Sequence, residues 1–158
     1  MRIYLLVMTF LFSMVGSAQQ ERDTVLKRCP MFITDTVSSN NFFIEGLPCT
    51  IRVFRPKGEL TMELRQKDQY FTLFFHVKKL KNTRYKIRVG GRSNSEVESR
   101  YSFRSGDQVS FVDVSSGTVE TSFDKEKKLW RIKVNGLLAN MVERSVTYYR
   151  VRSDFYVR

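Results

Sequence analysis

The feature that most constrains the fold is a series of short segments in which apolar and polar residues alternate. Alternation with a period of two is typical of β-strands that bury one face. Clusters of glycine, serine, asparagine and aspartate separate the segments, and helical periodicity is almost absent. The sequence therefore predicts an all-β sandwich or barrel, with strands at residues 50–54, 60–64, 70–77, 85–89, 97–103, 108–114, 118–123, 129–135, 138–142 and 148–157.

Two turn signals divide the second half of the chain. Ser115-Ser116-Gly117 lies between two predicted strands, and Asn135-Gly136 lies between two others. Asn-Gly is a strong hairpin signal because both residues tolerate a positive φ angle. We therefore expect the chain to turn at both places.

The N-terminal residues have the pattern of a secretory signal peptide. Arg2 precedes an apolar stretch at residues 4–15, and the small residues Gly16-Ser17-Ala18 follow it. A cleaved targeting helix fits this pattern better than a membrane span, which needs about 20 apolar residues. We therefore expect residues 1–18 to be a signal peptide and residues 19–43 to form an N-terminal arm. The protein is expected to be secreted and extracellular, with no transmembrane segment.

Cys29 and Cys49 are the only cysteines in the chain. In an oxidising compartment they are expected to form a disulfide, which would tie the N-terminal arm to the first strand of the domain. Two cysteines and one histidine are too few for a structural zinc site, which usually has four such ligands. The sequence thus predicts a disulfide, with no metal and no cofactor.

The chain is strongly basic, with 27 Lys and Arg residues against 16 Asp and Glu residues and a formal net charge of +11. A secreted protein with this charge favours anionic partners such as sulfated glycans or acidic lipid headgroups. The alternative is a solvated surface with no particular partner. Nucleic acid is not expected as a partner, because the sequence has no nucleic-acid-binding motif.

From residue 44 to residue 158, the order of the segments resembles a galectin-type carbohydrate-recognition domain. Gly46-Leu47-Pro48 followed by Ile51-Arg52-Val53 is similar to the first turn and strand of that family. The run from Leu129 to Gly136 and the run from Asp154 to Val157 resemble its final strands. The resemblance implies that residues 44–158 form a jelly-roll sandwich of two antiparallel sheets.

In the first half of the galectin sugar site, this chain has different residues at all three ligand positions. Galectins present a His, an Asn and an Arg on alternate residues of one strand, and Phe74, His76 and Lys78 occupy the corresponding positions. Their neighbours Leu73 and Phe75 alternate with them and are expected in the core. The Lys78 ammonium keeps a positive charge, but it does not reproduce the fixed fork of a guanidinium.

The second half of the site matches better. Galectins carry a stacking Trp followed by a Glu and an Arg, and Glu98 and Arg100 match the last two by spacing. Ser95 stands where the Trp is expected, which removes the apolar platform for a sugar ring. The alternative for Glu98 and Arg100 is an ordinary ion pair on a solvated sheet.

The predicted strand at residues 85–89 decides the charge of this face. A direct alignment with galectins places Val89 on the ligand face. Burial favours a different register, in which Tyr85, Ile87 and Val89 face the core and Lys86 and Arg88 face the ligand. The ligand-binding face would then be basic, and its candidate residues are Phe74, His76, Lys78, Arg88, Glu98 and Arg100.

These residues predict a binding protein and not an enzyme. The sequence has no nucleophile motif, no metal-ligand cluster and no carboxylate pair with glycosidase spacing, so no catalytic residue is assigned. The expected partners are glycans or glycoproteins. The lost Trp and the added cations predict weak binding of simple β-galactosides and better binding of acidic or sulfated glycans.

Two alternatives to a lectin remain at this point. The domain could be an extracellular protein-interaction module that has lost sugar binding. It could also be a carrier of an apolar ligand that resembles a lipocalin, although the early Gly-x-Trp turn of that family is absent.

Overall fold

The computed structural model describes residues 23–40, 48–142 and 145–158, and this part of the chain is all-β, as predicted. The predicted signal peptide at residues 1–18 lies outside the described residues, and so does most of the Gly46-Leu47-Pro48 turn. Within the described residues, no helix has both the length and the apolar character needed to cross a membrane.

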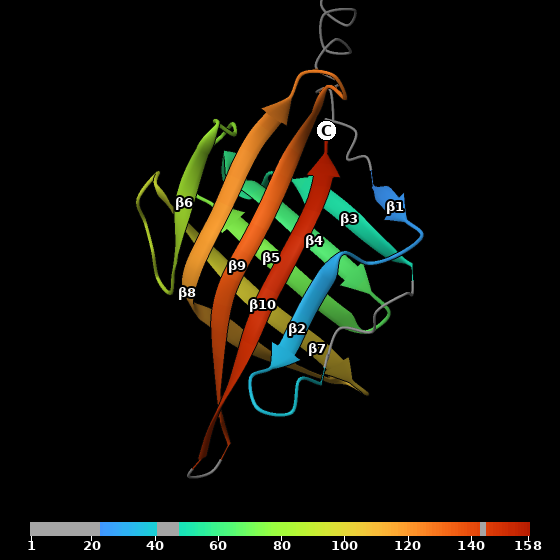
Figure 1. Ribbon diagram of the computed structural model, residues 1–158, viewed down its shortest axis with the longest axis vertical. Coiled ribbons are helices and arrows are strands. Elements are labelled where there is room, and N and C mark those ends of the chain that lie inside the picture. Colours follow the sequence, from blue (N-terminus) through green and yellow to red (C-terminus); the bar gives the residue numbers. More distant parts are fainter. Residues whose placement is uncertain (1–22, 41–47, 143–144) are drawn as a thin grey trace, which may run out of the picture.

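The strands of the described residues all belong to one sheet (Figure 1). Its order is β1-β3-β4-β5-β7-β6-β8-β9-β10-β2, whereas the sequence predicts two separate antiparallel sheets. Neighbouring strands are antiparallel except for β6 and β7, which pair in parallel. The strands are β1 (Thr24–Leu26), β2 (Met31–Asp35), β3 (Cys49–Phe54), β4 (Leu60–Gln66), β5 (Gln69–Phe75), β6 (Thr83–Arg88), β7 (Glu96–Ser105), β8 (Gln108–Asp124), β9 (Leu129–Val142) and β10 (Ser145–Val157), with a short 3-10 turn at Pro56–Gly58.

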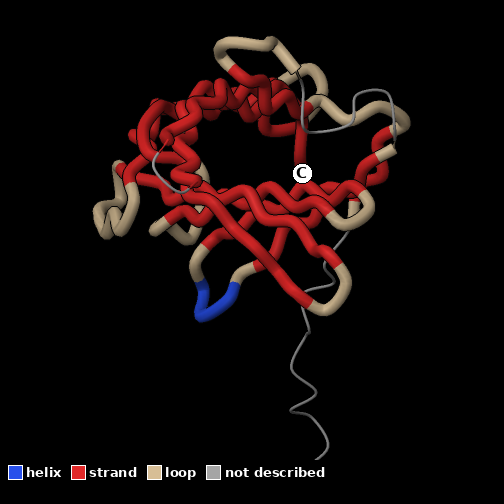
Figure 2. Tube along the Cα trace, turned by 90° about the horizontal axis from the view of Figure 1, so that it is seen from below, coloured by secondary structure: helices blue, strands red, loops and turns tan. Residues whose placement is uncertain are grey.

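The sheet curls so that its two halves face each other as layers. One layer contains β3, β4, β5 and β7, and the other contains β8, β9, β10 and β2, whose strands cross in front of the first in Figure 1. Figure 2 shows the two layers from one end of the molecule. β8 belongs to both layers, because residues 108–113 pair with β7 and the rest of the strand pairs with β6 and β9.

The core lies between the layers and is made of the alternate residues that the sequence assigns to it. Leu73 and Phe75 of β5 are 0% and 1% exposed, and the Phe75 ring meets the Tyr85 ring edge-on at 5.2 Å between centroids. Tyr85 and Ile87 are buried, which confirms the preferred register of β6, but Val89 is 56% exposed and its predicted place in the core was wrong.

The segment expected to be an N-terminal arm supplies both edge strands of the sheet. β1 pairs with β3, and β2 pairs with β10. Met31 and Ile33 of β2 are 0% and 1% exposed, so this strand contributes to the core. Only residues 27–30 separate β1 from β2 along the chain, which brings the two edges of the sheet close together.

Cys29 and Cys49 lie side by side at this junction, but they are free thiols in the structure. The predicted disulfide is therefore absent. Both residues are buried, at 2% and 3% exposure. The hydrogen bond between the thiols lowers the pKa of Cys29, and the same bond, together with burial, raises the pKa of Cys49. The Cys49 thiol of the pair therefore keeps its proton.

Both turn predictions for the second half of the chain were wrong. β8 runs through Ser115-Ser116-Gly117 with a register shift between Val114 and Ser116, and β9 runs through Asn135-Gly136. A bulge of this kind bends a strand without ending it. Glycine at these positions therefore marks a close approach of two long strands instead of a reversal of the chain.

Candidate functional site

The candidate residues on β5 and β7 lie on the outer face of the first layer. The two strands are direct neighbours, and their register places Phe74 opposite Glu98 and Thr72 opposite Arg100. The intervening residues of both strands point into the core and are buried, so alternation directs the candidate side chains outward. The structure therefore brings together Phe74, His76, Glu98 and Arg100, which we call the β5–β7 face.

His76 sits between two carboxylates on this face. Its Nε2 atom lies 3.5 Å from Oε1 of Glu98, and its Nδ1 atom lies 3.8 Å from Oε2 of Glu59. The imidazole is mostly covered, with 17% of the side chain exposed, whereas Glu59 is 59% exposed. Nε2 is shielded from solvent and has no hydrogen-bond partner among the described residues. The imidazole therefore has an unused polar atom at the centre of the face.

Arg100 is fixed by two contacts with β8. Its Nε donates to Oδ1 of Asp113 at 2.7 Å, and its second terminal nitrogen donates to Oδ2 at 3.4 Å. The guanidinium also lies over the Phe111 ring, 4.2 Å from the centroid. Both contacts follow from the pairing of β7 with β8, in which Arg100 faces Asp113 directly. The two contacts limit the rotamers of the guanidinium, and its remaining N–H groups stay available to a ligand.

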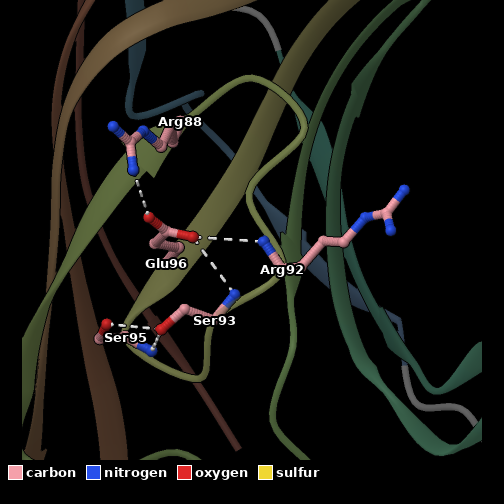
Figure 3. A network of polar contacts seen from close by, with 5 residues as sticks. All are labelled: Arg88, Arg92, Ser93, Ser95 and Glu96. Carbon is pink, nitrogen blue, oxygen red and sulfur yellow. Dashed lines mark hydrogen bonds and ion pairs between the residues drawn. The ribbon is translucent and has the colours of Figure 1, made fainter.

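Arg88 belongs to a different network, which supports the loop between β6 and β7 (Figure 3). It donates to Oε1 of Glu96 at 3.1 Å, and Oε2 of Glu96 accepts the backbone N–H groups of Arg92 and Ser93 at 3.2 Å each. The bond from the Ser93 backbone, followed by the bond from Arg88, lowers the pKa of Glu96. Ser95, which replaces the galectin Trp, hydrogen-bonds to Ser93 in the same loop.

Lys78 is the candidate with the weakest connection to the site. It follows β5 and is exposed, and its backbone oxygen accepts a hydrogen bond from Nε of Arg55 at 3.4 Å. No ion pair of Lys78 is found among the described residues. The structure thus unites four of the six candidates, places Arg88 beside them in another network, and leaves Lys78 apart.

Three residues of the site were missed by the sequence analysis, namely Glu59, Phe111 and Asp113. Asp113 and Phe111 alternate along β8, and the turn at residues 105–107 sets their register against β7. That register was available from the sequence, since Ser105 pairs with Gln108 and Arg100 therefore pairs with Asp113. Within the described residues, no group of three or more acidic, His or Cys side chains is arranged to hold a metal ion.

Comparison with known proteins identifies no relative of this chain: no family model, no curated protein and no solved structure matches it. The membership of the galectin family that the sequence suggested therefore stays a prediction.

Proposed function

We propose that the protein is a secreted glycan-binding domain whose ligand lies on the β5–β7 face. The observation that carries this proposal is the grouping of one aromatic ring, one imidazole, one carboxylate and one guanidinium on two adjacent strands. The galectin resemblance places sugar contacts at these positions, and a two-sheet jelly roll is the finer architecture that it implies.

The chemistry of the face suits sugar hydroxyl groups. Glu98 can accept hydrogen bonds and Arg100 can donate them, and Arg100 is already held by Asp113, which reduces the entropy lost on binding. Phe74 is half-buried between Thr61 and Glu98, so its ring offers an apolar surface beside these polar groups. A small polar ligand with hydroxyl groups and an apolar face would satisfy both kinds of surface.

The charges of the β5–β7 face favour a neutral glycan. Arg100 is paired with Asp113, and the carboxylates of Glu59 and Glu98 flank His76. A sulfate group would approach two carboxylates at this place, which costs Coulomb energy. The ligand proposed for this face is therefore an uncharged saccharide, in contrast to the acidic or sulfated ligand that the lost Trp and the added cations of the face predicted.

An acidic glycan suits the outer face of β9 and β10 better. Arg150 and Arg152 project from alternate positions of β10 and have no ion-pair partner among the described residues. Two grooves of about 350 and 660 Å³ meet at Asn135, with Arg150 in the first and Arg152 and Lys133 in the second. We therefore propose that sulfated glycans bind this surface, which we call the β9–β10 face, and not the face for which the sequence predicted them.

An array of neutral and sulfated glycans tests the proposal. The wild-type protein should bind neutral saccharides, and Arg100→Gln should lose this binding. Arg84→Gln is a matched control, because Arg84 also pairs with a carboxylate, Glu120 at 2.6 Å, but lies on β6. If Arg100→Gln kept its binding of neutral glycans, the result would contradict a glycan site on the β5–β7 face.

A second experiment, enzymatic removal of glycans from the binding partner, separates the lectin from the alternative predicted by the sequence, a protein-interaction module. A lectin should lose its cell-surface or matrix partner after enzymatic removal of the partner's glycans. Partner binding that survives this treatment, together with an array that shows no bound glycan, would support the protein-interaction module.

A further inference from the structure

The two layers separate at one end of the molecule, and a pocket opens between them. β8 pairs with β9 only from Val114 onward, where Val114 faces Leu138. Before that point, residues 108–113 follow β7, whereas residues 139–142 of β9 pair with β10. The strands on the two sides of the gap therefore diverge, and the space between them has a volume of about 570 Å³. This lies within the range of about 300–1,000 Å³ that is typical of small-molecule sites.

The inner wall of this inter-layer pocket is apolar. Ile33 and Leu138 are 1% and 2% exposed and form the part nearest the core. Tyr101, Phe103, Val112 and Tyr149 add further apolar surface to the wall, and Gln69, Ser105 and Asn140 line it as well. Burial raises the pKa of Tyr101, as expected for a hydroxyl group in surroundings that disfavour charge. A sugar would leave its hydroxyl groups poorly paired against this wall, whereas a hydrocarbon chain would gain from leaving water.

The mouth of the pocket is basic. Lys67, in the turn between β4 and β5, and Arg104, near the end of β7, both line it and are exposed. The backbone N–H of Arg104 donates to the backbone oxygen of Asp68 at 2.8 Å, which ties the turn to the end of β7. The Asp68 carboxyl group also lines the mouth, so the two cations exceed the one acidic group. Neither cation has an ion-pair partner in the part of the chain that the structure describes.

From this combination we infer that the inter-layer pocket binds a long-chain carboxylate, with the hydrocarbon chain between the layers and the carboxylate at Lys67 and Arg104. The apolar wall accounts for the chain and the two cations account for the charge of the head group. This site lies between the layers, whereas the β5–β7 face lies on the outside of the first layer. The inference therefore does not depend on the proposed glycan binding.

Fluorescence titration with cis-parinaric acid tests the inference on the full secreted chain after delipidation. We expect saturable binding, displacement by palmitate, and at least about tenfold weaker displacement by methyl palmitate, because the ester cannot form a charge-assisted hydrogen bond. Displacement that is equally strong with acid and ester would overturn the role of the two cations. Absence of saturable binding by the delipidated protein would overturn the site itself.

Two kinds of variant locate the bound probe. Val112→Phe fills the pocket and should abolish binding, with circular dichroism used to confirm that the variant folds. The charge variant Lys67→Gln/Arg104→Gln changes only exposed side chains and should weaken cis-parinaric acid binding about tenfold or more. Lys125→Gln, an exposed cation in the turn between β8 and β9, is the matched control and should bind like the wild type. Unchanged binding by both Val112→Phe and the charge variant would place the probe elsewhere and contradict the inference.

Discussion

Gly117 of β8 lies directly opposite Gly136 of β9, and a Cβ atom on Gly117 would come within 2.3 Å of the backbone oxygen of Asn135. The φ angle of Gly117 is +141°, a conformation that side-chain-bearing residues rarely adopt. The two strands approach this closely beside the bulge at which β8 passes from one layer to the other. The contact leaves no room for a side chain at Gly117.

Replacing Gly117 by alanine should therefore be strongly destabilising. Because the clash is with backbone atoms, we expect Gly117→Ala to lower the free energy of unfolding by about 3 kcal/mol or more in urea titrations. Gly106→Ala is the control, since Gly106 also has a positive φ angle but has open space around its Cβ position. That variant should lose only about 1–2 kcal/mol. Equal losses in the two variants would contradict the close approach of β8 and β9.

Glu96 should make folding sensitive to acid. Its pKa is lowered in the folded state, mainly by the hydrogen bond from the Ser93 backbone, relative to about 4.3 in the unfolded chain. The carboxylate therefore stabilises the fold above the unfolded-state pKa, and this contribution is lost as the pH falls through the folded-state pKa. We expect Glu96→Gln to lower the free energy of unfolding at pH 7 and to have little effect at pH 2.

Urea titrations at the two pH values check this prediction. Glu126→Gln, in the exposed turn between β8 and β9, serves as the control for removing a carboxylate. A stability difference between the wild type and Glu96→Gln that is the same at pH 7 and pH 2 would show that the charge of Glu96 is not what supports the loop.

The state of Cys29 and Cys49 can be tested directly with Ellman's reagent. Because both thiols are free and buried, the native protein should react slowly, and urea without a reductant should expose two reactive thiols. The Cys29→Ser variant should expose one thiol under the same conditions. A wild-type protein that stays unreactive in urea would instead contain the disulfide that the sequence predicts.

Binding of sulfated glycans should depend on the β9–β10 face. The wild-type protein is expected to bind a heparin column and to elute with salt, because screening weakens the attraction between exposed charges. Arg150→Gln/Arg152→Gln should elute at a lower salt concentration. Arg100→Gln should elute later than this variant, since the guanidinium of Arg100 is already paired with Asp113. Elution of both variants at the same salt concentration would argue against a localised sulfate-binding surface.

Alternation in the sequence is enough to predict which residues of the central strands are buried between the layers. The buried positions of β5, β6 and β7 follow the period of two, and the outward direction of Phe74, Glu98 and Arg100 follows from it. Trp130 alternates with Ile132 and Val134, which predicts a place in the core, but it is only partly buried and packs against Phe123 at the end of the β8–β9 hairpin, where the ring centroids are 5.3 Å apart. Strand ends are less well predicted than strand centres because they lie at the rim of the core.

Other parts of the structure depend on contacts between distant segments. β1 and β2 are too short for their alternation to stand out in the sequence, and they form as strands by pairing with the edges of β3 and β10. The parallel pairing of Ile87 with Val97 places β6 between β7 and β8, and no local pattern indicates it. The inter-layer pocket arises from the divergence of β8 and β9, and the turn signal at Asn135-Gly136 pointed to a different topology there.

The affinity of the best neutral glycan for Glu98→Gln, measured by isothermal titration calorimetry, tests the central proposal most directly. Glu98 touches His76 and faces Phe74, whereas Glu120, the control carboxylate, pairs with Arg84 on the other layer. We predict that Glu98→Gln binds about tenfold or more weakly than the wild type, because it loses a charge-assisted hydrogen bond, and that Glu120→Gln binds normally. Equal affinities for the two variants would contradict a glycan site on the β5–β7 face.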